Sequence, residues 1–194
     1  MPNLNTLFPV FLKLDQISIL VVGGGNVALE KLTNIYRSST TAKIHLVAPM
    51  IRPETFDLLF KKKIPFTLDG YNDSFLKGVQ LVFITTDNKE LNKTIFLDCK
   101  KKGIIANVAD TPELCDFYMG SIITKGSLKI ALSTNGKSPT FAKRMREWLE
   151  DLIPEDIDEF LDHLKRYRET LKGDFEFKIK KMNEAVALLI DKHD

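Results

Sequence analysis

The sequence predicts an α/β fold: a Rossmann-like, doubly wound parallel sheet, followed by a small α+β domain and a helical domain at the C-terminal end. Three observations predict this class. A short apolar run at residues 17–22 ends in three glycines, and a helical pattern starts at once. Further apolar runs alternate with helical stretches to about residue 107, at the spacing of βαβ units. Beyond residue 110, an alternating two-stranded pattern and amphipathic stretches replace that order.

The bulk composition is that of a soluble protein with one or two domains. The chain has 194 residues, 44% of them hydrophobic, and a net charge of +2. No apolar run reaches the length of a membrane span, and the N-terminus has no basic-then-apolar signal pattern, so we expect a cytoplasmic protein. Cys99 and Cys115 lack metal or redox spacing and the histidines are scattered, so no metal site is predicted.

The glycine turn after the first predicted strand is typical of dinucleotide binding. Gly23, Gly25 and Ala28 occupy the positions of a G-x-G-x-x-G/A motif. The first glycine permits the tight turn, the second lets a pyrophosphate approach bare backbone, and the small third residue lets the helix pack on the strand. The alternative is a tight turn with no ligand. The cofactor-binding candidates here are Gly23, Gly24, Gly25, Asn26 and Val27.

The second predicted strand, residues 43–49, leaves the choice of cofactor open. NAD sites often carry an acid near the end of this strand, which binds the 2′-hydroxyl of the ribose. This chain has Ala48 and Pro49 there, both cofactor-binding candidates. Arg52 lies close enough to raise NADP as an alternative. A helix from Pro53 to about residue 63 follows.

Three more strands are predicted at residues 64–68, 81–86 and 104–107, with a helix ending near residue 102 before the last of them. In doubly wound sheets, ligands bind beyond the carboxyl ends of the strands. We therefore expect the glycine turn and the ends of the fourth and fifth strands to line one crevice. The candidates that these two strands add are Thr85, Thr86, Asp87, Asn107 and Asp110.

The second half of the chain begins with a predicted hairpin over residues 121–133, followed by a helix that Ser138 and Pro139 open. Residues 117–146 hold six basic residues and no acid, which favours a small polyanion as ligand over nucleic acid, because aromatic residues do not alternate with the bases. A solvated basic surface is the alternative. The expected domains are residues 1–112, 113–150 and 151–194.

Taken together, these segments resemble the precorrin-2 dehydrogenase/sirohydrochlorin ferrochelatase family, which also forms the front part of siroheme synthases. The resemblance covers about residues 5–153. It rests on residues 23–28, 85–88 with Asn92, 107–110, 114–117, and 133–139 with Ala142, Arg144 and Arg146.

The resemblance implies NAD-dependent oxidation of precorrin-2 to sirohydrochlorin in a homodimer, with the hairpin and following helix at the dimer interface and the helical domain completing the substrate site. It also implies insertion of Fe²⁺, although the sequence does not decide whether this chain has that activity. The substrate-binding residues implied are Ser133, Thr134, Asn135, Gly136, Lys137 and Arg146. Relatives often carry a modified serine where this chain has Thr134, so that regulation is not expected here.

Asp110 is the predicted catalytic residue. Oxidation of precorrin-2 moves a hydride to the nicotinamide and releases a proton, so a base is needed near the departing proton. The family has its key aspartate at this position. The alternative is a capping role, because Asp110-Thr111-Pro112 is also good turn chemistry.

Two other functions fit the same residues. One is a non-catalytic, NAD-sensing regulatory domain, against which the basic stretch and the extra hairpin argue. The other is an oxidoreductase for a different acidic metabolite.

Overall fold

The computed structural model describes residues 5–190, and the side chains of residues 5–187. The chain divides into two compact units, Met1–Met119 and Gly120–Asp194, which we describe separately. The predicted division into three domains stays a prediction. Residues 1–4 of the first predicted domain and residues 191–194 of the third lie outside the described residues.

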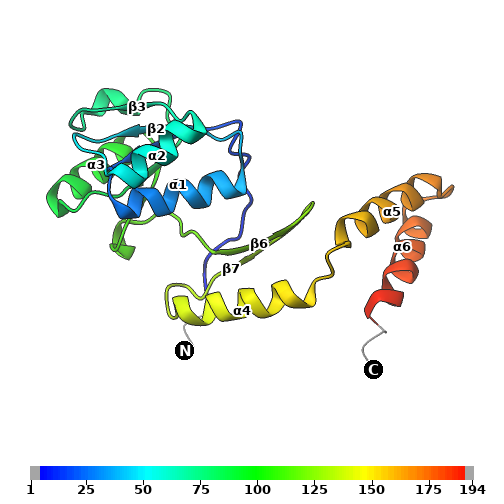
Figure 1. The fold of residues 1–194 in the computed structure, drawn as a ribbon. Helices are drawn as coiled ribbons and strands as arrows, with labels where there is room; N and C mark the ends of the chain where they lie inside the picture. The colour runs from blue at the N-terminus through cyan, green and yellow to red at the C-terminus, as the bar shows by residue number, and fades with distance from the viewer. Residues whose placement is uncertain (1–4, 191–194) are drawn as a thin grey trace. The chain divides into compact units, whose positions relative to one another are not determined.

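The first unit is a parallel sheet wound on both faces, as the sequence predicts (Figure 1). The sheet order is β3-β2-β1-β4-β5, and all four pairings are parallel. β2 and β3 are added on one side of β1, and β4 and β5 on the other. The strand order therefore reverses between β1 and β4. The elements are β1 (Ser18–Val22), α1 (Asn26–Ser38), β2 (Lys43–Val47), α2 (Pro53–Lys62), β3 (Phe66–Thr67), η1 (Asp73–Leu76), β4 (Leu81–Ile84), α3 (Lys89–Lys101), β5 (Ile105–Val108) and η2 (Pro112–Leu114).

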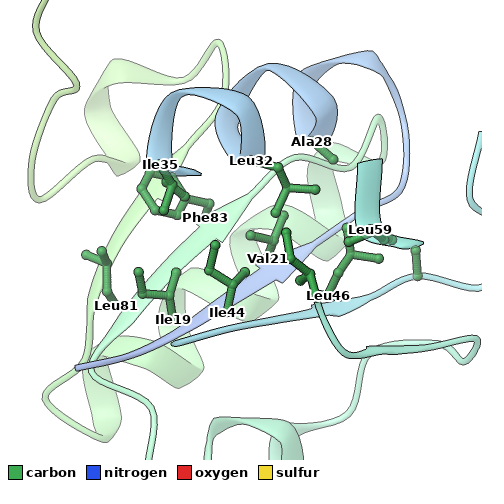
Figure 2. Packing of buried hydrophobic residues seen from close by; sticks show 12 residues of the cluster. Ile19, Val21, Ala28, Leu32, Ile35, Ile44, Leu46, Leu59, Leu81 and Phe83 are labelled. Atoms are coloured by element: carbon green, nitrogen blue, oxygen red, sulfur yellow. The ribbon is translucent and has the colours of Figure 1, made fainter. Parts of the chain in front are cut away.

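Two hydrophobic cores hold the helices on the sheet, because successive side chains of a strand point to opposite faces. Ile19 and Val21 pack with α1 and α2 on one face, while Leu20 and Val22 pack with α3 on the other. Figure 2 shows Leu32 and Ile35 of α1 among strand side chains of the first core. The central strands are buried on both faces, which explains their continuous apolar runs.

β3 is shorter than predicted. The helix before it ends at Lys63 in the left-handed region, with a φ of 55°, and the backbone N–H of Ile64 donates to the carbonyl of Leu59 at 2.8 Å. Ile64 therefore completes the helix end, and only Phe66 and Thr67 pair with β2.

The second unit holds the antiparallel pair β6 (Ser121–Lys125) and β7 (Leu128–Leu132), then α4 (Pro139–Leu152), α5 (Ile157–Thr170) and α6 (Phe175–Ile190). The hairpin turn is joined to the start of α5. The Asp158 carboxylate accepts the Ser127 backbone N–H at 2.7 Å, and the Lys125 ammonium donates to the Ile153 carbonyl at 2.6 Å. A Cβ at Gly126 would come within 2.2 Å of Asp158, so this turn needs glycine.

A membrane span requires a helix of sufficient length and hydropathy. Over the described part of the chain, every helix is too short or too polar to cross a bilayer.

Candidate functional site

The first two glycines of the turn are required by packing. Gly23 has a φ of +117°, and a Cβ there would lie 2.6 Å from the Thr85 hydroxyl oxygen. A Cβ on Gly24 would lie 2.3 Å from the Met50 carbonyl oxygen. The turn is thus pressed between the end of β4 and the segment that follows β2.

Gly25 differs from its neighbours, because an added Cβ there would meet no atom within 4 Å. The carbonyls of the turn are already used: that of Gly24 accepts the Arg52 backbone N–H at 3.0 Å, and that of Gly25 accepts the Thr55 hydroxyl at 3.3 Å. The N–H groups of the first turn of α1 have no intrahelical partner, and no side chain caps them. Open space and free N–H groups together fit the pyrophosphate of a dinucleotide.

Ala28 and the start of α1 have the expected packing. Ala28 is fully buried against the sheet, so a larger side chain would push the helix away. Asn26 is exposed and Val27 partly exposed at this helix start, while Ala48 is buried and Pro49 exposed at the end of β2.

The loop after β4 is built from internal hydrogen bonds. The Thr85 hydroxyl donates to the Val22 carbonyl at 2.9 Å, which ties the ends of β4 and β1 together. Asn92 of α3 donates to the Thr86 carbonyl at 2.9 Å and also pairs with the Thr86 hydroxyl. Asn88 caps α3 by accepting the Leu91 N–H at 3.0 Å, and Asp87 is exposed. Thr85 and Gly23 are therefore in contact, as the single-crevice hypothesis requires.

Asn107 and the residues after η2 hold the end of β5. The buried Asn107 side-chain amide donates to the Phe117 carbonyl at 2.9 Å. The Cys115 thiol donates to the Val108 carbonyl at 3.1 Å, and burial raises the pKa of this thiol. The Asp116 carboxylate accepts the Ala106 N–H at 3.0 Å and pairs with Lys100 at 2.6 Å. These bonds tie residues 115–117 to β5 and so join the two ends of the segment that contains Asp110.

Asp110 itself is exposed and has a φ of 55°, a strained backbone conformation for a residue other than glycine. Within residues 5–190 no hydrogen bond or ion pair reaches its carboxylate, and the Thr111 side chain does not cap η2 either. A capping role would require such a bond. The geometry therefore favours the reactive alternative over the structural one.

The predicted substrate loop precedes α4 in the second unit. Asn135 and Gly136 both have positive φ, of 53° and 75°. The Ser133 hydroxyl accepts the Asn135 N–H at 3.2 Å, and the Thr134 hydroxyl accepts the Ser138 N–H at 3.1 Å. Ser138 caps α4 by accepting the Phe141 N–H at 3.2 Å, as predicted. These candidates belong to the second unit, and the glycine turn belongs to the first.

Acids from outside the basic stretch already neutralise part of its charge. Arg146 pairs with Glu150 and, at 3.5 Å, with Glu147. Lys125 pairs with Glu155 at 2.6 Å, and Lys143 lies 3.9 Å from Glu147. Arg144 and Lys137 have no ion pair among the described residues. Arg144 is therefore a further candidate for binding an anion, beside Lys137. The i,i+4 spacing of Arg146 and Glu150 in the sequence indicates that Arg146 is paired with an acid.

The described residues contain no group of three or more histidine, cysteine or acidic side chains that could hold a metal ion. Cys99 is a buried core residue, and burial raises the pKa of its thiol to about 11. Two surface hollows of about 610 and 490 Å³ share Lys77, Gly78 and Val79 at the amino edge of the sheet, and none of the predicted site residues lines them.

The strand order, the glycine turn and the uncapped start of α1 define a Rossmann-type dinucleotide-binding protein. A family model described as "Putative NAD(P)-binding" matches residues 10–121, and a second, "Sirohaem biosynthesis protein central", matches residues 125–152. The chain belongs to this NAD(P)-binding family, with the siroheme-biosynthesis module following it, as the resemblance in its motifs predicts.

Curated relatives are siroheme synthases. The one from Psychrobacter arcticus is 38% identical over 148 residues, which is 76% of this chain and 27% of that protein. The one from Nitrosomonas europaea is 34% identical over 168 residues, covering 86% of this chain and 35% of that protein. The chain therefore spans about a quarter to a third of the length of these relatives.

A solved structure has the same fold over nearly the whole chain. It is that of SirC, a precorrin-2 dehydrogenase, with a TM-score of 0.72 at 24% identity, covering 93% of this chain and 89% of that one. This likeness confirms the predicted Rossmann-like fold with a helical C-terminal region.

Proposed function

We propose that this chain is an NAD-dependent dehydrogenase that oxidises precorrin-2 to sirohydrochlorin in siroheme biosynthesis. The observation that carries the proposal is Asp110: its backbone has a φ of 55°, and its exposed carboxylate has no partner within the described residues, at the carboxyl edge of the sheet that bears the glycine turn. The names of the relatives and of the solved structure agree with this activity.

The backbone of the turn supplies the cofactor site. Gly25 leaves room for the pyrophosphate, and the first N–H groups of α1 bind its negative charge. We propose further contacts from the remaining candidates at the strand ends, with NAD as the cofactor: Gly23, Gly24, Asn26, Val27, Ala48, Pro49, Thr85, Thr86, Asp87 and Asn107. When bound, the nicotinamide accepts the hydride.

Asp110 accepts the proton that the substrate loses as the hydride leaves. A neighbouring cation would make a carboxylate a weaker base, and within the described residues no cation pairs with Asp110. The bonds of Cys115 and Asp116 keep its turn in place, and such preorganisation is what proton transfer requires.

The substrate carries eight carboxylates, and we propose that residues 133–137 and Arg146 bind them. Lys137 is the stronger candidate of the two cations, since Arg146 already pairs with Glu150. The rest of this proposal is a homodimer working in the cytoplasm. The homodimer follows from the family resemblance, and the exposed apolar side chains of α4 support it. The cytoplasmic location follows from the sequence pattern.

Iron insertion is the second activity to test. Sirohydrochlorin must lose its pyrrole N–H protons as Fe²⁺ enters, and Asp110 is the acceptor that the site offers. Iron would be a substrate here, because it leaves the protein within the product.

The proposal is tested by incubating the protein with precorrin-2 and NAD, with and without Fe²⁺, and recording absorption spectra. Formation of sirohydrochlorin together with reduced nicotinamide supports the dehydrogenase, and a further change only with Fe²⁺ supports chelation. Unchanged NAD would favour a regulatory domain. Turnover with another acidic metabolite but not with precorrin-2 would favour a different oxidoreductase.

A further inference from the structure

The segment between β2 and α2 is packed directly on the glycine turn. The Arg52 backbone N–H donates to the Gly24 carbonyl at 3.0 Å, and the Thr55 hydroxyl donates to that of Gly25 at 3.3 Å. Gly24 faces the Met50 carbonyl so closely that no Cβ could fit. The first residues of α2 are therefore fixed against the turn that binds the pyrophosphate.

In Rossmann folds, the end of the second strand is where the adenosine ribose is recognised. An acid there binds the 2′-hydroxyl of NAD, and an arginine accommodates the 2′-phosphate of NADP. In this chain β2 ends at Val47 and is followed by Ala48, Pro49 and Met50, whose side chains can serve neither role. The first charged side chains after it are those of Arg52 and Glu54, which form an ion pair with 3.7 Å between Nε and Oε2.

We propose that the Arg52–Glu54 pair sets the cofactor preference of this chain, in favour of NAD over NADP. This inference rests on the proposed dinucleotide site. Arg52 is the only cation of the residues 48–55, and Glu54 holds it. A 2′-phosphate would have to displace Glu54 from Arg52 and would meet a negative carboxylate as well. The unphosphorylated ribose of NAD meets neither penalty.

Both side chains are more than half exposed, at 54% and 60%, so substitutions there leave the core intact. Glu54→Gln keeps the size of the side chain and removes its charge, which releases Arg52. Arg52→Gln removes the cation. A matched control is Asp73→Asn, which also removes the acid of an exposed ion pair, with Lys102 at 3.0 Å, but lies at the opposite, amino edge of the sheet.

The experiment is titration calorimetry of the full chain with NAD and with NADP at low ionic strength. We expect the wild-type protein to bind NAD at least about tenfold more tightly than NADP, since each repulsive or lost charge contact changes affinity by a few fold. Glu54→Gln should tighten NADP by about three- to fivefold and leave NAD within about twofold. Arg52→Gln in the Glu54→Gln background should reverse that gain, and Asp73→Asn should change neither affinity.

The outcomes separate this inference from the proposed function. If neither nucleotide binds, the dinucleotide site itself is wrong. If NAD binds but Glu54→Gln leaves the ratio of the two affinities unchanged, or if the wild-type protein prefers NADP, the role of the Arg52–Glu54 pair is refuted while the dehydrogenase proposal stands.

Discussion

The two units of the chain bury their apolar side chains to very different extents. In the first, β1, β4 and most of β2 and β5 are buried, and two cores cover both faces of the sheet. In the described part of the second, Ile123 and Ala142 are the buried hydrophobic residues. There the α4 residues Phe141, Trp148 and Leu152 are 56%, 57% and 54% exposed.

This difference indicates that the units have different tasks. The first has the buried area of an independent domain and positions its strand ends by hydrogen bonds, which suits a site that needs fixed geometry. The second consists of two strands and three helices, and a two-stranded sheet is marginally stable on its own. Its exposed apolar side chains Phe141, Trp148 and Leu152 on α4 are here called the apolar ridge. It needs a covering surface, and a second copy of the chain is the partner that we predict.

The strongest test asks whether the chemistry belongs to the first unit. Asp110→Asn keeps the side-chain shape, and asparagine tolerates the positive φ of this position. We expect oxidation of precorrin-2 to fall about 10²–10⁴-fold, the usual contribution of a positioned base. NAD affinity and melting temperature should stay near wild type. Full activity in this variant would remove Asp110 from the mechanism, and iron insertion measured separately would show whether one carboxylate serves both steps.

The second test removes the apolar ridge of the second unit. The wild-type protein should be a dimer by light scattering at micromolar concentration. Trp148→Glu places a charge on the ridge and should weaken the dimer by about 30-fold, the effect of losing roughly 2 kcal/mol at a central aromatic contact. Asp110→Asn serves as the control with unchanged mass. A monomeric wild-type protein would contradict the interpretation of the exposed side chains.

The third test separates ligand binding from packing within the glycine turn. Gly25→Asp places a charge in open space beside the expected pyrophosphate, so NAD affinity should fall at least tenfold, or about 1.4 kcal/mol, with little loss of stability. Gly24→Ala should instead lower the melting temperature, because its Cβ would collide with Met50. Calorimetric NAD affinity close to wild type in Gly25→Asp would refute the placement of the nucleotide.

The smallest effects are expected in the basic loop of the second unit. Neutralising Lys137 and Arg146 together should raise the apparent KM for the substrate a few fold and weaken its salt dependence, with NAD affinity nearly unchanged. As a single substitution, Lys137→Gln should produce most of the increase in KM that the double variant shows. Arg146→Gln should mainly cost stability, about 0.5 kcal/mol, because it breaks the i,i+4 pair with Glu150. Normal steady-state kinetics in the double variant would make the basic stretch solvated surface only.

Periodicity and glycine spacing were enough to predict the parallel sheet, the turn at residues 23–25 and the hairpin. These features are local, since apolar alternation, Asn88 as a cap and Pro53 at a helix start all act within a few residues. The same reasoning did not anticipate how short β3 is, because Ile64, the first residue of the predicted strand, instead completes the end of the preceding helix by bonding to the Leu59 carbonyl.

What the amino-acid sequence alone determined is the class of fold and which residues stand at the strand ends. What only the tertiary structure decided is the state of those residues. The left-handed backbone at Asp110, the absence of a partner for its carboxylate within residues 5–190, and the open space at Gly25 depend on where other segments lie. A side chain's availability is the charge and space that its neighbours leave unused, and those neighbours are brought to it by the packing of the folded chain.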